Sequence, residues 1–112
     1  MALTLIQNVP QVAVGLQTYT FTIPATPTPL QYTVHFEATE LPPSGLTVVV
    51  KQGLATVFTA PVIAQTQSNM KFDFPFLFTG GDVVTVVMTS VEPNDALLNS
   101  VKSICSISNG GR

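Results

Sequence analysis

The sequence predicts an all-β protein, folded as an antiparallel β-sandwich or jelly roll of about seven or eight strands. Three observations support this fold class. Apolar and polar residues alternate with period two along several short segments, which is typical of strands with one buried face. Residues that form turns, mainly Pro and Gly, separate these segments. The chain has 112 residues, and neither a linker nor an internal repeat divides it, so residues 1–112 are expected to form one domain.

The first segment, residues 1–14, is apolar but is interrupted by polar residues and by Pro10. We expect it to act as an N-terminal arm that lies along a neighbouring subunit and pairs with it by strand addition. The alternative is that it forms the first strand of this domain's own sheet. It lacks a basic leading region, so it is not expected to be a signal peptide. Four apolar side chains of the arm are the predicted contacts with a partner: Leu3, Leu5, Val9 and Val12.

The next two segments alternate most clearly. Residues 18–24 read TYTFTIP, and residues 32–38 read YTVHFEA. In each segment aromatic and aliphatic residues occupy every second position, which suits a half-buried strand. The Pro-rich stretch 24–29 and the stretch LPPSG at 41–45 are expected to be turns. The predicted inward-facing residues are Tyr19, Phe21, Ile23, Tyr32, Val34, Phe36 and Ala38.

Residues 46–61 are expected to form two strands that are hinged near Gln52 and Gly53. The following strand, 70–78, reads MKFDFPFLF. Because Pro75 cannot donate a ladder hydrogen bond, this strand is expected to be an edge strand or to be bulged there. Its phenylalanines are expected to belong to the core. The alternative is an exposed aromatic platform that binds sugars.

The C-terminal third is expected to contain two more strands. A turn at TGGD, residues 79–82, precedes a strand over 83–90. Residues 92–100 are the one helical candidate, in which Asp95 could cap a single turn. The last strand covers residues 100–108, and residues 109–112 are expected to form a flexible tail.

Charged residues are scarce. They make up 9% of the chain, whereas about 25% is usual, and apolar residues make up 46%. A surface with so few charges is expected to be covered, by copies of this chain or by a larger assembly. The net charge of −2 and the lack of a basic patch argue against nucleic-acid binding. No uncharged apolar stretch is long enough for a membrane helix.

No set of residues indicates catalysis, a metal site or a cofactor. The single histidine, His35, shares a predicted strand face with Glu37, but two ligands do not complete a zinc site. Asp82 follows two glycines and is expected to belong to a turn, because the spacing of a phosphate-binding loop is missing. The carboxylates of Asp73 and Glu40 are not expected to serve as catalytic acid or base. The only cysteine, Cys105, cannot form an internal disulfide, and we expect it to be a small buried residue.

Two resemblances to known families add to this interpretation. The stretches TYTFTIP (18–24), LQYTVHFEATE (30–40) and LFTGGDVVTVVM (77–88) resemble strands of C1q/TNF-type jelly rolls. That resemblance implies a homotrimer. The stretch NDALLNSVKSICSIS (94–108) resembles the C-terminal ends of small bacteriophage virion proteins, in which a similar N-x-V-K-S/T motif precedes a final strand. The matching residues are Asn99, Val101, Lys102 and Ser103.

The second resemblance implies a capsid decoration or cement protein, made in the host cytoplasm and located on the outer surface of a virion. The expected partners are the major capsid protein and copies of this chain. On this interpretation, the arm residues Leu3, Leu5, Val9 and Val12 contact the capsid and the protein stabilises the shell without enzymatic activity. The alternative is a carbohydrate-binding β-sandwich module of a phage fibre or baseplate.

Overall fold

A computed structural model of the chain describes residues 2–25, 30–39, 46–60, 69–90 and 101–109. These residues contain β-strands but no helix, hence no helix that is long and apolar enough to cross a membrane. The strands are β1 (Ala2–Thr4), β2 (Gln11–Val14), β3 (Thr18–Thr22), β4 (Leu30–Thr39), β5 (Leu46–Gln52), β6 (Ala55–Thr59), β7 (Asn69–Phe78), β8 (Val83–Ser90) and β9 (Lys102–Asn109).

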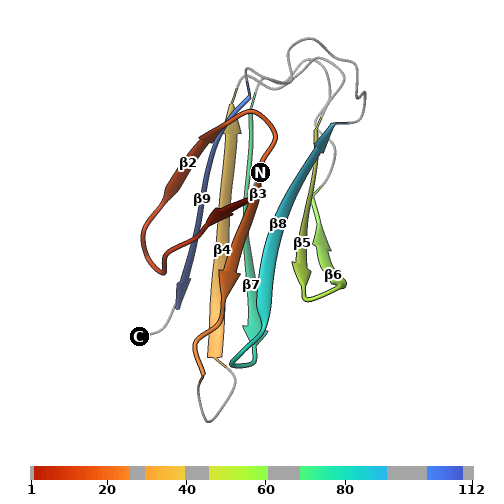
Figure 1. The fold of residues 1–112 in the computed structure, drawn as a ribbon. Coiled ribbons are helices and arrows are strands. Elements are labelled where there is room, and N and C mark those ends of the chain that lie inside the picture. Colours follow the sequence, from red (N-terminus) through yellow and green to blue (C-terminus); the bar gives the residue numbers. More distant parts are fainter. Residues whose placement is uncertain (1, 26–29, 40–45, 61–68, 91–100, 110–112) are drawn as a thin grey trace.

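The strands form two sheets that pack face to face (Figure 1). The five-stranded sheet has the order β1-β3-β8-β5-β6, and the four-stranded sheet has the order β2-β9-β4-β7. Neighbouring strands are antiparallel, except that β1 runs parallel to β3. From β3 to β9 the chain passes repeatedly from one sheet to the other, as in a jelly roll. The predicted all-β sandwich is therefore confirmed.

The core lies between the two sheets and follows from the period-two alternation. Every second side chain of β3, β4, β5 and β8 points inward, where it is removed from water. Complete burial of such a side chain is worth about 1.5–3 kcal/mol, so these residues provide most of the driving force for folding. The predicted inward-facing residues of β3 and β4 are all buried. The largest fully buried side chains include Tyr19, Tyr32, Phe36, Phe78, Leu46, Ile107, Val34, Val48, Val50 and Val84.

The described residues form nine strands, compared with the seven or eight expected, because the N-terminal segment contributes two short ones. The chain reverses at Asn8, whose φ of 65° lies in the left-handed region that Asn tolerates better than most residues. The amide of Val9 donates to the carbonyl of Ile6 across this turn, at 3.0 Å. As a result β1 joins one sheet, β2 joins the other, and the segment closes one side of the sandwich.

Two local predictions are confirmed. The strand that contains Pro75 lies at the edge of the four-stranded sheet, where one side of its backbone has no strand neighbour among the described residues. The hinge expected near Gln52 and Gly53 is the tight turn between β5 and β6, and Gly53 has a φ of 62°. Most residues with a Cβ atom adopt that conformation only with strain, so the turn favours glycine here.

Several predictions concern residues that lie outside the described ranges. These are the helical turn with Asp95, the motif residue Asn99, the turn at 41–45, most of the Pro-rich turn, and Glu40. Of the predicted tail, Asn109 is the last residue of β9, and residues 110–112 lie outside the described ranges.

Candidate functional site

His35 lies between two carboxylates on the outer face of the four-stranded sheet. Its Nδ1 atom is 2.6 Å from Oδ1 of Asp73, and its Nε2 atom is 2.6 Å from Oε2 of Glu37. His35 and Asp73 are direct partners in the β4–β7 register, and Glu37 lies two residues further along β4. The two ring nitrogens can both donate only when the imidazole is protonated.

The surroundings of His35 favour that protonated form. The hydrogen bond with Asp73 is the largest cause, and it raises the pKa of His35 above its ordinary value of 6.5. Partial burial lowers this pKa, but the hydrogen bond with Glu37 and the two nearby negative charges raise it further. The geometry is that of an imidazolium held between two carboxylates.

This geometry does not suit metal binding. A histidine binds a metal through the lone pair of a ring nitrogen, and both nitrogens of His35 are engaged with carboxylates. Among the described residues, no group of three or more His, Cys, Asp or Glu side chains is arranged to hold a metal ion. His35 and Glu37 share one face of β4, as the alternation predicts, and a hydrogen bond joins them.

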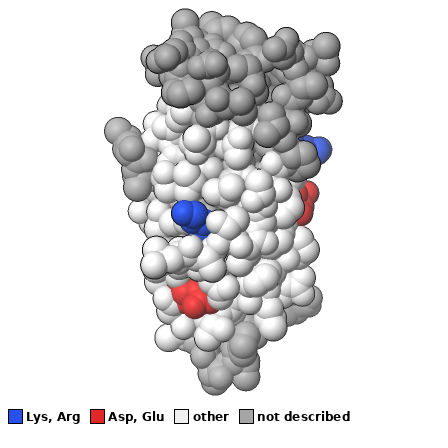
Figure 2. Space-filling view, turned by 90° about the vertical axis from the view of Figure 1, so that its right-hand side faces the viewer, with Lys and Arg blue, Asp and Glu red and all other residues white. Residues whose placement is uncertain are grey.

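Among the described residues, charge is concentrated on this one face. Four of the six charged residues in the described ranges lie on the outer face of the four-stranded sheet: Glu37, Lys71, Asp73 and Lys102. The other two are Lys51, on β5, and Asp82, in the turn before β8. Figure 2 views the molecule from the side of β5 and β6 and shows a surface with few charged groups.

An apolar patch adjoins the charged cluster on the same face. Val12 and Val14 of β2 are 68% and 57% exposed, and Ile104 of β9 is 38% exposed. Val12 and Ile104 are direct partners in the β2–β9 register. A shallow pocket of about 240 Å³ lies here, and its lining includes Val12, Ile104, Glu37 and Thr39.

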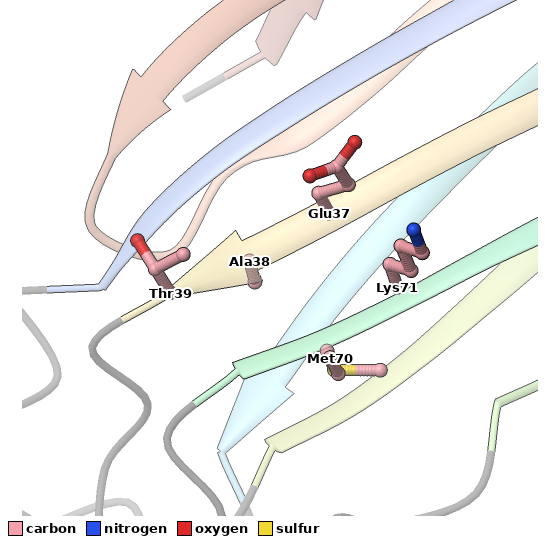
Figure 3. A pocket seen from close by; sticks show the side chains of 5 residues that line it. All are labelled: Glu37, Ala38, Thr39, Met70 and Lys71. Carbon is pink, nitrogen blue, oxygen red and sulfur yellow. The ribbon is translucent and has the colours of Figure 1, made fainter.

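A second pocket of about 330 Å³ lies where β4 and β7 meet (Figure 3). Figure 3 shows the side chains of Glu37 and Lys71 on one side of the sheet and that of Met70 on the other. Ala38 and Thr39 complete the lining. The lining therefore combines a carboxylate, an ammonium group, a hydroxyl and the thioether of the buried Met70.

The four predicted capsid-contact residues occupy different environments. Leu5 is 2% exposed, and its amide donates to the carbonyl of Thr20 at 2.8 Å, so it belongs to this domain's own core. Leu3 is half-buried in β1 and packs against that core. Val9 and Val12 are 44% and 68% exposed. Of the set, these two offer apolar surface to a partner.

Asp82 has a local structural role. Its Oδ2 atom accepts hydrogen bonds from the backbone amide of Thr79 at 2.9 Å and from Nε2 of Gln52 at 2.6 Å. The amide of Asp82 in turn donates to the carbonyl of Thr79. The carboxylate therefore closes the turn between β7 and β8 and ties it to the end of β5, as expected for a turn residue.

The sequence predicts that the phenylalanines of β7 belong to the core or, alternatively, form an exposed aromatic platform, and the four residues differ in this respect. Phe78 is fully buried, whereas Phe72, Phe74 and Phe76 are half-buried and line the side of the sandwich between β7 and β6. The ring of Phe74 stacks on Phe58 of β6, with centroids 4.8 Å apart, and on Phe76, with centroids 5.5 Å apart. Since these rings stack on one another, they offer less free face to a sugar.

Two features of the site were not predicted. Asp73 was not assigned to His35, and Ser103 was not recognised as a buried polar residue. Ser103 is 1% exposed, and its hydroxyl lies 2.7 Å from that of Tyr19. The alternation in each strand predicts which side chains face inward. The His35–Asp73 and Tyr19–Ser103 pairs also depend on how strands that are distant in sequence align. Cys105 is buried, as expected, and burial raises the pKa of its thiol to about 12.

Comparison with known proteins relates the chain to others by fold only. No family model matches the chain, and no curated protein matches its sequence significantly. The pre-peptidase C-terminal domain of a collagenase from Bacillus anthracis is similar in structure, with a TM-score of 0.55 and 11% sequence identity. That match covers 96% of this chain and 94% of the other.

A second similar structure is ZmpB from Clostridium perfringens, which comprises an M60 catalytic domain with two CBM51 domains. Its TM-score is 0.61 at 11% identity, and the match covers 88% of this chain and 10% of the longer one. GITRL from bushbaby matches with a TM-score of 0.45 at 15% identity, over 76% of this chain and 68% of that one. The first two matches support the β-sandwich architecture.

Proposed function

We propose that this chain is a non-enzymatic binding module that attaches to the outside of a phage capsid as a decoration or cement protein. The observation that carries this proposal is the distribution of charge. Four of the six described charged residues lie on one sheet face, and the rest of the described surface carries only Lys51 and Asp82 among mainly Thr, Ser, Gln and apolar side chains. Such a surface suits a protein that is largely covered by an assembly.

The repeated lattice of a capsid shell is consistent with a binding protein whose individual contacts are weak. A decoration protein that occurs in many copies gains its retention from weak contacts repeated over the shell, so no single contact has to be strong. The exposed Val9 and Val12 offer apolar contacts to a major capsid protein. The C1q/TNF resemblance adds the expectation of a trimer, which would suit a threefold position on the shell.

A carbohydrate-binding module is the second candidate, and the structural comparisons favour it. One of the similar structures includes CBM51 domains, whose name denotes a carbohydrate-binding module. The half-buried Phe72, Phe74 and Phe76 are the aromatic side chains that could meet a sugar. Their mutual stacking and the lack of Trp in the sequence favour the capsid proposal.

The test is to find the chain on particles. Particles from the source organism are separated on a density gradient, and each fraction is analysed by quantitative mass spectrometry. We expect the chain to sediment with the major shell protein in a fixed ratio, and to be released before the shell breaks. Recovery of the chain only in particle-free fractions would contradict the proposal. Glycan-array binding without particle binding would favour the second candidate.

A further inference from the structure

The outer face of the four-stranded sheet carries its charges in a checkerboard. His35 and Glu37 alternate along β4, and Asp73 and Lys71 alternate along β7. The register sets His35 opposite Asp73 and Glu37 opposite Lys71. Figure 3 shows Glu37 and Lys71 on the same side of the sheet. With His35 protonated, each of the four charges has an opposite charge beside it, both along its strand and across to the next.

A checkerboard of this kind is complementary to its own copy. Consider a second copy whose four-stranded sheet lies face to face with the first. The two-fold axis lies between the two sheets and runs perpendicular to the strands. It passes between the His35–Asp73 row and the Glu37–Lys71 row. The rotation exchanges the two rows, so His35 of one copy faces Glu37 of the other, and Asp73 faces Lys71. Each contact occurs twice, as in any isologous interface. All four facing pairs have opposite charge.

The same axis brings the apolar patch into the contact. Ile104 lies opposite Glu37 in the β4–β9 register, and Val12 lies opposite Ile104 in the β2–β9 register. These three residues therefore share one row across the sheet. The rotation places the Val12–Ile104 rows of the two copies next to each other, on either side of the axis. Burial of the exposed Val12 and Ile104 then provides an apolar contribution, and the charges determine the orientation.

We propose that the outer face of the four-stranded sheet is the surface through which two copies of this chain pair about a two-fold axis. The partner is a second copy, because the two-fold rotation places each charge of this face opposite a charge of the other sign. Most of the other described surface carries no charged side chain that could pair with this face. The inference does not rest on the capsid proposal, but it assigns Val12 to the two-fold contact, which leaves Val9 of the predicted set exposed for a capsid. It also differs from the threefold assembly that the C1q/TNF resemblance implies, and a measured mass separates the two.

The test uses charge reversal followed by mixing. Lys71→Glu puts two like charges opposite each other at both Asp73–Lys71 contacts, and so does Asp73→Lys. Each variant alone should pair at least about tenfold more weakly, because like charges in a contact are costly. Mixed in equal amounts, Lys71→Glu and Asp73→Lys should pair again, since the acidic strand of one then faces the basic strand of the other. Lys51→Glu makes the same charge change on the other sheet and should pair normally.

Sedimentation equilibrium at about 100 μM gives the mass, since a micromolar Kd leaves most chains paired there. We expect twice the chain mass of 11.9 kDa for the natural protein. A mass of one chain, or of three, would overturn the proposal, as would equal weakening by Lys51→Glu. Circular dichroism and thermal melting verify folding. If either β7 variant fails to fold, Val12→Asp replaces it, because this side chain is 68% exposed in the single chain. Pairing that survives Val12→Asp also overturns the proposal.

Discussion

The hydroxyl groups of Tyr19 and Ser103 lie 2.7 Å apart and link the two sheets through the core. Tyr19 belongs to β3 and Ser103 to β9, and 84 residues of sequence separate them. Both residues are almost completely buried, so neither hydroxyl can exchange its partner for water. Burial, the largest cause, raises the pKa of Tyr19 and keeps the phenol neutral. The pair is a neutral hydrogen bond in a dry environment, which makes its loss measurable.

Removal of both partners should cost less than the sum of the two single removals. Ser103→Ala leaves the Tyr19 hydroxyl without its side-chain partner and should lower the free energy of unfolding by about 1–3 kcal/mol. In Tyr19→Phe with Ser103→Ala, no orphaned hydroxyl remains, so the combined loss should be smaller than the sum of the single losses. Urea denaturation of the four proteins gives this coupling energy. Additive losses would show that the two hydroxyls do not interact.

The stability of the protein should depend on the protonation of His35. The hydrogen bonds with Asp73 and then Glu37 raise the pKa of His35 in the folded protein above 6.5, its ordinary value. Its stabilising contribution is therefore fully present below 6.5 and is lost as the pH rises through the folded-state pKa. Because the chain has a single histidine, its titration is directly resolved by NMR.

The expected result is a lower urea midpoint at about pH 9 than at about pH 6. His35→Gln should flatten this difference, because the substituted side chain does not titrate. An NMR-measured pKa of His35 at or below its ordinary value would contradict the geometry of the cluster.

The aromatic residues should differ in their importance according to burial. Phe36 is fully buried and stacks on Phe72 with centroids 5.4 Å apart. Phe36→Ala should cost about 3–5 kcal/mol, since it leaves a cavity. Phe76 is half-buried at the open side of the sandwich, so Phe76→Ala should cost clearly less. Thermal and urea unfolding of the two variants provides the comparison. Equal losses of unfolding free energy would mean that Phe76 is as well buried between β6 and β7 as Phe36 is in the core.

Substitution of Gly53 should destabilise the protein through backbone strain and not through a steric clash. Its φ is 62°, and a Cβ atom built there would meet no atom within 4 Å. Gly53→Ala should therefore destabilise the β5–β6 turn by about 1–2 kcal/mol through strain. Gly53→Asn should cost less, because Asn enters the left-handed region more readily. If both variants are as stable as the natural protein, the turn has a different conformation.

Local patterns were sufficient to predict which faces are buried, whereas pairs of distant residues were not predictable. The alternation in β3 and β4 is a property of each strand alone, and Pro75 indicates an edge because it lacks an N–H group. The contact between His35 and Asp73 depends on the register of two strands that are 38 residues apart in sequence. A shift of one residue in that register would place Asp73 on the other face of the sheet.

The N-terminal segment shows a different limit. Its apolar residues predicted either an arm or one strand of the domain's own sheet. The reversal at Asn8 and the break before Pro10 divide it between both sheets. Leu5 is buried and Val12 is exposed as a result, although the sequence offers both as equivalent apolar positions.

The last prediction concerns the reactivity of Cys105. The thiolate is the form that attacks alkylating reagents, and burial disfavours it. The pKa of Cys105 is raised to about 12, so at about pH 8 only roughly one thiol in ten thousand is ionised in the folded protein. The sulfur is also inaccessible, since the residue is 0% exposed.

We expect native protein to be labelled by iodoacetamide many times more slowly than guanidinium-unfolded protein, which serves as the control. Mass spectrometry of intact protein over time gives both rates. Labelling of the native chain at the unfolded rate would show that β9 opens readily from the core.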